Sequence, residues 1–176
     1  MNLENLHTST LEKLFGAIDL RIIRQDEDVR IVQLNDENGI SRTLGIVKFF
    51  NIENDLLVEV HEKILEGGLL GKTLFDSNIN FNKKFIGTLQ VKLPQWLKND
   101  FDTEQDSSFA IISKISIYND RLSNDKLLYS ELIEIIPPEL TDVFIDKTKQ
   151  LENISLNVLS LFKSANLEVI KLDKES

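Results

Sequence analysis

The chain contains no cysteine among its 176 residues. A disulfide framework, a thiolate nucleophile and a cysteine-based metal site are therefore excluded. Its two histidines, His7 and His61, are far apart, and neither has a second histidine at metal-ligand spacing. We therefore expect neither a metal ion nor any other cofactor.

Long apolar runs are also absent, and the N-terminal sequence lacks the basic-then-apolar pattern of a signal peptide. The formal net charge is -9, which disfavours attraction to nucleic acid or to an anionic membrane surface. We expect a protein without nucleic-acid or membrane partners, in the cytoplasm or an equivalent compartment such as the plastid stroma. The sequence does not predict an oligomeric state.

Phosphate-binding loops are missing as well. The segment Gly67-Gly68-Leu69-Leu70-Gly71-Lys72-Thr73 ends in Gly-Lys-Thr, but its glycines do not have the spacing of a P-loop. No Gly-x-Ser-x-Gly nucleophile motif occurs either. Nucleotide-binding and common hydrolase functions are therefore disfavoured.

The pattern that is present predicts one domain over residues 1–176, because the composition does not change along the chain and no repeat occurs. Apolar and β-branched runs predict three strands within 18–50 and three more at 85–93, 109–118 and 126–136, with a further edge strand at 167–172. Helices are expected from Ser9 to Gly16, over 56–65 and as one long amphipathic helix over 144–161. The segment after Gly68 is expected to be a loop, and 99–106 an exposed loop or flap. The expected fold class is α+β, with a single antiparallel sheet of about six strands and flanking helices that enclose a ligand pocket.

Three segments resemble the chorismate pyruvate-lyase family in type and order. Leu69-Leu70-Gly71-Lys72-Thr73-Leu74-Phe75 is similar to that family's Pro-Leu-Gly-Arg-x-Leu-Phe segment. Leu127-Leu128-Tyr129-Ser130-Glu131-Leu132, followed by Pro137, is similar to its Leu-Leu-Leu-Thr-Glu-Leu strand. Arg30-Ile31-Val32-Gln33-Leu34 is similar to its Arg-Glu-Ile-Leu-Leu strand.

The resemblance implies an enzyme that eliminates pyruvate from chorismate without a cofactor and leaves 4-hydroxybenzoate for quinone head-group synthesis. It implies that Arg30 and the backbone amide of Leu70, beside Gly71, hold a substrate carboxylate. Glu131 is then expected to face the hydroxyl-bearing end of the ring and to assist proton movement. Arg30 and Glu131 are accordingly the predicted catalytic residues, and Arg30, Leu70, Gly71 and Glu131 the predicted binding residues.

The alternation of side chains along strands supports these roles independently. Arg30 has the same parity as Val32 and Leu34, so its guanidinium is expected on an apolar face, where it needs an anionic partner. Glu131 has the same parity as Ile133, so it is expected among apolar neighbours too. A purely structural alternative is an internal ion pair between Arg30 and Glu131.

The chain departs from the family in two places. The family's Gly-Arg-Thr-Val-Val-Pro strand corresponds to residues 45–50, where Ile46 replaces the arginine, unless Arg42 takes its place under a different gap. A second family arginine corresponds to the neighbourhood of Lys83 and Lys84. Whether Arg42 or either lysine contacts the ligand is left open.

Two other functions compete with the lyase. A ligand-sensing module, like the effector domains of some bacterial transcription regulators, has the same fold, although only about 17 residues precede the first predicted strand, which is too few for a winged helix. A structural or interaction protein that uses the apolar stripe of its C-terminal helix is the other candidate.

Overall fold

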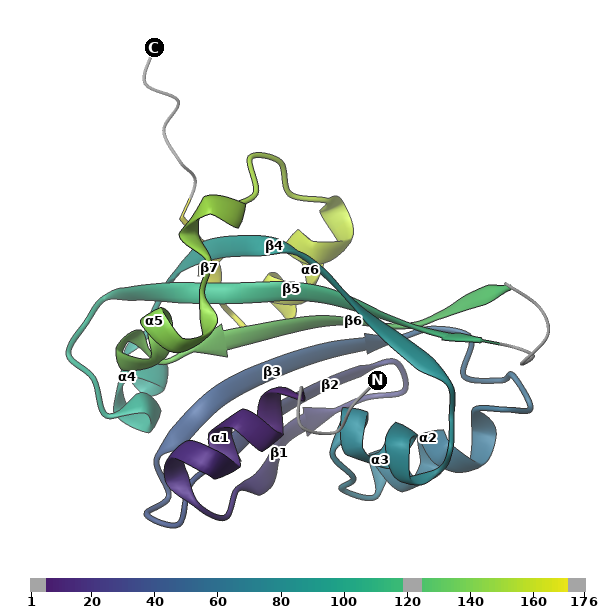
Figure 1. The fold of residues 1–176 in the computed structure, drawn as a ribbon. Coiled ribbons are helices and arrows are strands. Elements are labelled where there is room, and N and C mark those ends of the chain that lie inside the picture. Colours follow the sequence, from purple (N-terminus) through teal and green to yellow (C-terminus); the bar gives the residue numbers. More distant parts are fainter. Residues whose placement is uncertain (1–5, 119–124, 171–176) are drawn as a thin grey trace.

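The computed structural model describes residues 6–118 and 125–170. Its centre is one antiparallel sheet in the order β1-β2-β3-β6-β5-β4-β7 (Figure 1). The strands are β1 (Asp19–Gln25), β2 (Val29–Asn35), β3 (Ser41–Phe49), β4 (Phe81–Lys92), β5 (Ser107–Tyr118), β6 (Lys126–Ile136) and β7 (Glu168–Val169).

Six α-helices and two short 3-10 turns accompany the sheet in the described part of the chain. They are α1 (His7–Phe15), α2 (Val58–Leu65), α3 (Leu70–Asp76), α4 (Gln95–Phe101), η2 (Pro138–Leu140), α5 (Thr141–Phe144), η3 (Lys147–Lys149) and α6 (Leu156–Ser164). Buried side chains of α4 and α6 pack on one face of the sheet, and those of α1, α2 and α3 lie over the opposite face. The predicted α+β fold with flanking helices is confirmed.

Strand β2 is buried on both faces, as expected for a strand inside a layered fold. Ile31 joins the core beneath α4 and α6, while Arg30, Val32 and Leu34 point toward the side of α1 and α3. The predicted parity of Arg30 is therefore confirmed. All six predicted strands are found, although β4 begins at Phe81, four residues earlier than expected. The short β7, at the place of the predicted edge strand, brings the described sheet to seven strands.

The prediction of one long helix over 144–161 is wrong. The chain forms only α5 and the 3-10 turn η3 before α6 begins at Leu156. Asp146 accepts a hydrogen bond from the backbone N–H of Thr148, and Ser155 accepts one from the N–H of Val158. Short polar side chains of this kind are unfavourable inside a helix but stabilise the first turn of a new one. The predicted helix is therefore divided into separate short segments.

The predicted flap over 99–106 is only partly correct. Residues 95–101 form α4, and its Leu97 and Phe101 are fully buried in the core. The helix ends at Asp102, whose φ of 54° is left-handed, and most of the stretch from Asp102 to Asp106 is exposed. Of the predicted edge strand over 167–172, β7 is found, while residues 171–172 lie outside the described residues.

The expected loop after Gly68 is instead the short helix α3, which begins at Leu70. Gly68 allows α2 and α3 to approach closely, because a Cβ there would lie 2.8 Å from the Lys63 carbonyl oxygen and 2.5 Å from the Thr73 hydroxyl. Gly71 likewise leaves room for the side chain of Leu6, because a Cβ at position 71 would lie only 2.9 Å from Leu6 Cδ2. The segment ahead of α1 is thereby packed against α3.

We expect Gly68→Ala to lower the free energy of unfolding by about 1–3 kcal/mol, because the added methyl group overpacks a site bounded by backbone. Urea denaturation measures this change. Thr73→Ala combined with Gly68→Ala removes the hydroxyl contact but keeps the backbone contact, so recovery should be partial. A single variant as stable as the original protein would contradict this account.

Strand β1 forms one edge of the sheet, and all its residues except the half-buried Leu20 are exposed. Its pairing with β2 is irregular between Ile22 and Arg24, so Ile23 forms a bulge.

No helix in the described part of the chain is long and apolar enough to cross a membrane.

Candidate functional site

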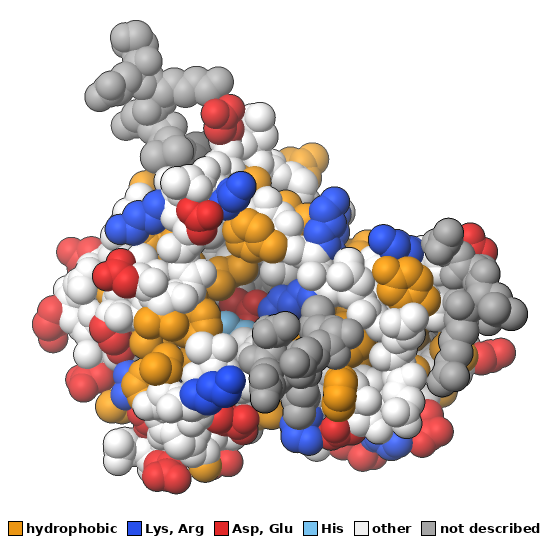
Figure 2. All heavy atoms as spheres, in the orientation of Figure 1, with side chains coloured by type: hydrophobic (Ala, Val, Ile, Leu, Met, Phe, Trp, Pro, Cys, Tyr) orange, Lys and Arg blue, Asp and Glu red, His pale blue; other side chains and the backbone are white. Residues whose placement is uncertain are grey.

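A pocket of about 120 Å³ lies between the sheet and the helices α1 and α3. Figure 2 shows a hollow near the middle of this face, with a histidine beside acidic and basic side chains at its floor. The wall is mostly apolar and includes Leu20, Val32, Leu34, Val47, Leu69, Leu70, Ile115 and Leu132. Polar groups are concentrated at a few positions, as is typical of sites for small organic ligands.

Arg30 supplies a buried positive charge to this pocket. Its side chain is only 2% exposed, and Nη1 donates to the Gly68 carbonyl oxygen at 2.9 Å. Among the described residues, Nε and Nη2 have no hydrogen-bond partner although both are buried. Burial lowers the pKa of Arg30, yet a guanidinium remains protonated at neutral pH. The pocket therefore contains a charged donor pair that an anion can satisfy.

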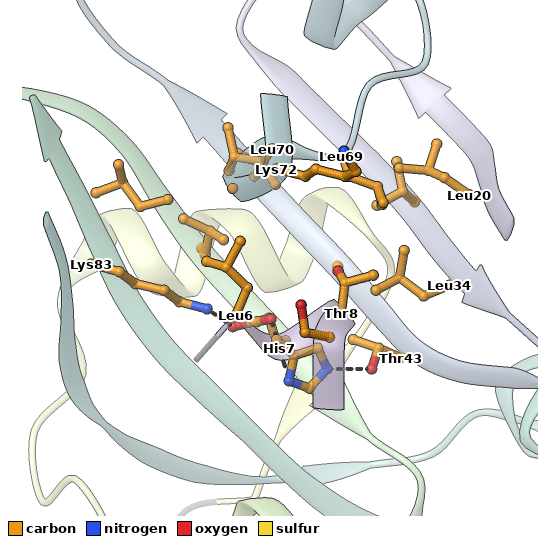
Figure 3. A pocket seen from close by; sticks show the side chains of 18 of the residues that line it. Leu6, His7, Thr8, Leu20, Leu34, Thr43, Leu69, Leu70, Lys72 and Lys83 are labelled. Atoms are coloured by element: carbon orange, nitrogen blue, oxygen red, sulfur yellow. Dashed lines mark hydrogen bonds and ion pairs between the residues drawn. The ribbon is translucent and has the colours of Figure 1, made fainter. Parts of the chain in front are cut away.

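A second polar group comes from β6 and β4. Lys83 Nζ donates to Glu134 Oε1 at 2.6 Å, and both residues line the pocket. Burial alone would raise the pKa of Glu134, but the charge and hydrogen bond of Lys83 hold it below its ordinary value. Glu134 is therefore an ionised acceptor. Figure 3 shows Lys83 and His7 directed toward the same end of the pocket, with Leu69 and Leu70 on another side.

His7 stands at the start of α1 and faces Glu134. Its Nε2 lies 2.7 Å from Thr43 Oγ1, and its Nδ1 lies 3.7 Å from Glu134 Oε2. Burial lowers the pKa of His7, and Lys83 adds to this effect, which outweighs the opposite influence of Glu134. His7 is therefore neutral near pH 7.

Three of the four predicted site residues lie together. Arg30, Leu70 and Gly71 all line the pocket, and the latter two belong to the first turn of α3, where backbone N–H groups have no acceptor within the helix. Their roles in binding remain predictions.

Glu131 is not among the residues that line this pocket. It pairs across the sheet with Lys48 and Lys114, and its Oε1 lies 3.5 Å from Lys114 Nζ. The predicted alternative of an Arg30–Glu131 ion pair is wrong, because Arg30 donates to Gly68 and Glu131 faces Lys114.

Glu131 is placed by the register of β6 with β3. Leu132 pairs with Val47, which is also the partner of Arg30, so Leu132 and Glu134 face the pocket. Glu131 pairs with Lys48 and faces the other side of the sheet.

A bulge in β6 adds to the difference between the expected and the observed pattern. Ser130 pairs with Ile115 but Leu128 pairs with Ser116, so Tyr129 is an extra residue. Tyr129 packs in the same cluster as Leu132, and the equal parity that the sequence predicts for Tyr129 and Glu131 is broken. The carboxylate that reaches the pocket is Glu134, three residues further along.

The sequence left open whether Arg42, Lys83 or Lys84 lies at the ligand site, and the structure shows where each of them is. Lys83 lines the pocket, whereas Lys84 does not belong to its lining. Arg42 lies outside that lining and forms ion pairs with Asp36 and Glu139.

Sequence reasoning missed His7 and Glu134 as pocket residues. Glu134 has the same parity as Leu132, but the sequence alone does not show which face of this strand lies toward the pocket. His7 gave no signal, because its position depends on how α1 packs on the sheet. The described residues contain no group of three or more histidine or acidic side chains that could hold a metal ion.

The two histidines should make stability depend on pH. Burial lowers the pKa of His7 and, together with the nearby Arg30 charge, that of His61, whose Nδ1 lies 2.8 Å from the Tyr129 hydroxyl. The unfolded chain binds protons at these histidines near pH 6.5 and the folded chain does not, so stability present above pH 6.5 is lost as the pH falls below it.

The expected fall in the free energy of unfolding is at most about 1.4 kcal/mol per pH unit for each histidine. Urea denaturation between pH 7.5 and 5.5 measures it. His7→Phe should give a shallower dependence than the original protein, and an equal or steeper one would show that His7 is not held neutral.

Comparisons with known proteins give structural similarity only. No family model and no curated protein matches the chain. A crystal structure of a GntR-family transcriptional regulator from Bacillus cereus is similar, with a TM-score of 0.48 and 12% identity, over 78% of this chain and 98% of that one. The C-terminal domain of Yurk from Bacillus subtilis subsp. subtilis str. 168 is similar at a TM-score of 0.39 and 13% identity, over 69% of this chain and 88% of that one. Neither similarity defines a shared family.

Proposed function

We propose that this protein binds a small organic carboxylate in the pocket between the sheet and α1 and α3, with Arg30 as the anchor. The main observation behind this proposal is that Nε and Nη2 of Arg30 are buried and have no hydrogen-bond partner in the described part of the chain. These two nitrogens share one edge of the guanidinium, and a carboxylate offers two oxygens with matching geometry. Leaving charged donors buried and unpaired is costly, so a bound carboxylate should be strongly favoured.

The size and the wall of the pocket define the rest of the ligand. A cavity of about 150 Å³ lined by apolar side chains holds one benzene molecule, so a space of about 120 Å³ fits a ligand with about one six-membered ring. The wall formed by residues such as Val32, Leu34 and Val47 suits an apolar ring face.

Binding without turnover, as in a ligand-sensing domain, is the first candidate. Glu134 is an inner carboxylate of the pocket, and Lys83 keeps it ionised, which makes it a weak base. Glu131, which the lyase resemblance assigns to proton movement, pairs with Lys114 away from the pocket lining. Both observations favour recognition over chemistry.

Chorismate pyruvate-lyase activity is the second candidate. It is favoured by the convergence of Arg30, Leu70 and Gly71 on one pocket, because the resemblance assigns the substrate carboxylate to these residues. For this activity, Glu134, which lines the pocket, has to replace Glu131 as the group that bonds the substrate hydroxyl and assists proton movement.

One experiment separates the two candidates. The purified protein is titrated calorimetrically with benzoate and 4-hydroxybenzoate, and is incubated with chorismate while 4-hydroxybenzoate absorbance and pyruvate are followed. We expect saturable carboxylate binding that Arg30→Gln removes, and no pyruvate. Glu131→Gln is the matched control, because it alters a buried carboxyl outside the pocket lining and should leave binding unchanged.

Equimolar pyruvate and 4-hydroxybenzoate, lost in Arg30→Gln, would establish the lyase instead. Loss of that turnover in Glu131→Gln would further restore the role that the resemblance gives to Glu131. Absence of both binding and turnover would overturn both candidates.

A further inference from the structure

The outer edge of β4 is free over the first half of the strand. β7 pairs with β4 only at Val91 and Lys92, and Gln150 forms an isolated bridge with Thr88. From Phe81 to Phe85, where β4 rises from α3 in Figure 1, no described strand lies on that side. This part of the sheet can therefore accept another strand.

The ladder between β4 and β5 shows which backbone groups face the free edge. The N–H of Tyr118 donates to the Asn80 carbonyl oxygen at 3.0 Å, and the pairing continues in the same register as far as Phe85. Hydrogen-bonded pairs alternate along an antiparallel ladder, so the backbone of Lys84 bonds to β5. The N–H and C=O groups of Lys83 and Phe85 therefore point to the free side.

A row of charged side chains crosses the sheet on the α6 side and ends at this edge. Lys48, Glu131, Lys114 and Lys84 are neighbours across β3, β6, β5 and β4. Lys48 lies 4.0 Å from Asp28, and Lys114 lies 3.5 Å from Glu131. Lys84 is exposed, stands opposite Lys114 and has no ion pair among the described residues. Like charges directly opposite one another are unfavourable, so an acidic side chain added beside Lys84 would be stabilising.

The geometry at Lys84 favours an ion pair with an added strand. Because its backbone bonds to β5, a residue placed opposite it on the free side forms a non-hydrogen-bonded pair. In such a pair the Cα atoms are about 4.5 Å apart and the side chains lie closest. On the other face of the strand, Phe85 is 44% exposed and offers an apolar contact. An extended segment that alternates apolar and acidic residues fits both faces.

A second copy of this chain fits the edge poorly. Pairing of two β4 edges would bring Lys83 and Lys84 of one copy close to the same lysines of the other, and edge lysines oppose such pairing. The formal net charge of the chain is -9, so an acidic partner is attracted by the edge and not by the molecule as a whole. Binding should therefore be local and weakened by salt.

We propose that the free edge of β4 binds an extended acidic segment of another protein by strand addition, with an acidic residue opposite Lys84 and an apolar residue opposite Phe85. Backbone hydrogen bonds at Lys83 and Phe85 supply affinity, and the two side-chain contacts supply specificity. The proposal does not depend on what the pocket binds.

Fluorescence anisotropy with labelled, end-blocked peptides tests the proposal. The probe is Val-Glu-Val-Glu-Val. It is compared with Val-Lys-Val-Lys-Val, which reverses the charge, and with Val-Glu-Pro-Glu-Val, which keeps the charge but lacks a backbone donor. We expect the probe to bind about fivefold or more tightly than either, because the first change turns a cross-strand attraction into repulsion and the second interrupts the ladder.

Two variants separate the charge from the backbone. Lys84→Glu should reverse the preference, so that the lysine peptide binds more tightly, and the new carboxylate faces Lys114, which favours the pairing of β4 with β5. Lys163→Glu is the matched control, because it makes the same change in net charge at an exposed position of α6. Phe85→Pro removes an outward N–H without removing a bond to β5, and should abolish binding. The peptide series on the original protein remains decisive if a variant does not fold.

Each contrary outcome identifies the part that fails. Equal binding of the probe and the proline peptide would show attraction of an anion alone and overturn strand addition. Equal binding of the glutamate and lysine peptides would overturn the acidic partner. Absence of binding by all three overturns the site. If the original protein then sediments as a dimer that Phe85→Pro converts to a monomer, the edge is occupied by a second copy.

Discussion

Replacing Arg30 by methionine is expected to raise the free energy of unfolding of the unliganded protein by about 1–4 kcal/mol while abolishing carboxylate binding. The guanidinium is 2% exposed and has a single hydrogen bond, to the Gly68 carbonyl, among the described residues. Methionine has a similar length and no charge to bury, so the desolvation penalty disappears. The Gly68 carbonyl loses its donor, which offsets part of the gain.

Urea denaturation measures the stability, and calorimetry with benzoate measures the binding. Arg24→Met is the matched control: its side chain is 49% exposed and paired with Asp26, so the stability should change by less than about 1 kcal/mol. A stabilised protein that no longer binds is typical of a residue kept for function at the expense of stability. Destabilisation by several kcal/mol would show instead that Arg30 is structural.

Glu134→Ala should have the opposite effect and destabilise the protein by about 3 kcal/mol. The carboxylate bonds to Lys83, whose side chain is 21% exposed, and removing it leaves an ammonium in a mostly apolar pocket. Because the pKa of Glu134 is held below its ordinary value of 4.5, the stability from this pair is present above that pH and is lost as the pH falls below it.

A double variant sharpens this test. Lys83→Leu combined with Glu134→Leu removes both charges and should recover most of the stability, as apolar replacement of a buried pair commonly does. Asp76→Ala serves as the surface control, because the ion pair between Lys72 and Asp76 is about half exposed and should contribute less than about 1 kcal/mol. Equal losses from Glu134→Ala and Asp76→Ala would contradict a special role for the buried pair.

The strands could be predicted from the sequence because their apolar runs are long and bounded by polar turns. Strand β6 matches its predicted range, and α2 begins within two residues of its prediction. The helical periodicity after residue 144 misled the prediction, since Leu151 and Ile154 do pack against the core but from irregular backbone. Burial of an apolar side chain does not require that its segment be helical.

The site could be predicted only in part. Arg30 was found because strand alternation is a local rule and β2 pairs regularly with β3 from Val29 to Leu34. Glu131 was misplaced because strand alternation does not say which face of β6 lies toward the pocket, and the register of β6 with β3 gives that face to Leu132 and Glu134. This register depends on how neighbouring strands pair, which no single segment of sequence records. His7 depends on the docking of α1, a tertiary contact with no local pattern.

The free edge formed by β1 has a consequence for handling the protein in concentrated solution. Ile22 and Ile23 are exposed at 39% and 43%, next to backbone groups that a neighbouring strand can pair with. The bulge and the positive charge of Arg21 oppose such pairing between two identical edges. Charge repulsion acts over about 10 Å at 0.1 M salt but only about 3 Å at 1 M. Aggregation through this edge should therefore increase with ionic strength, and storage at low salt should limit it.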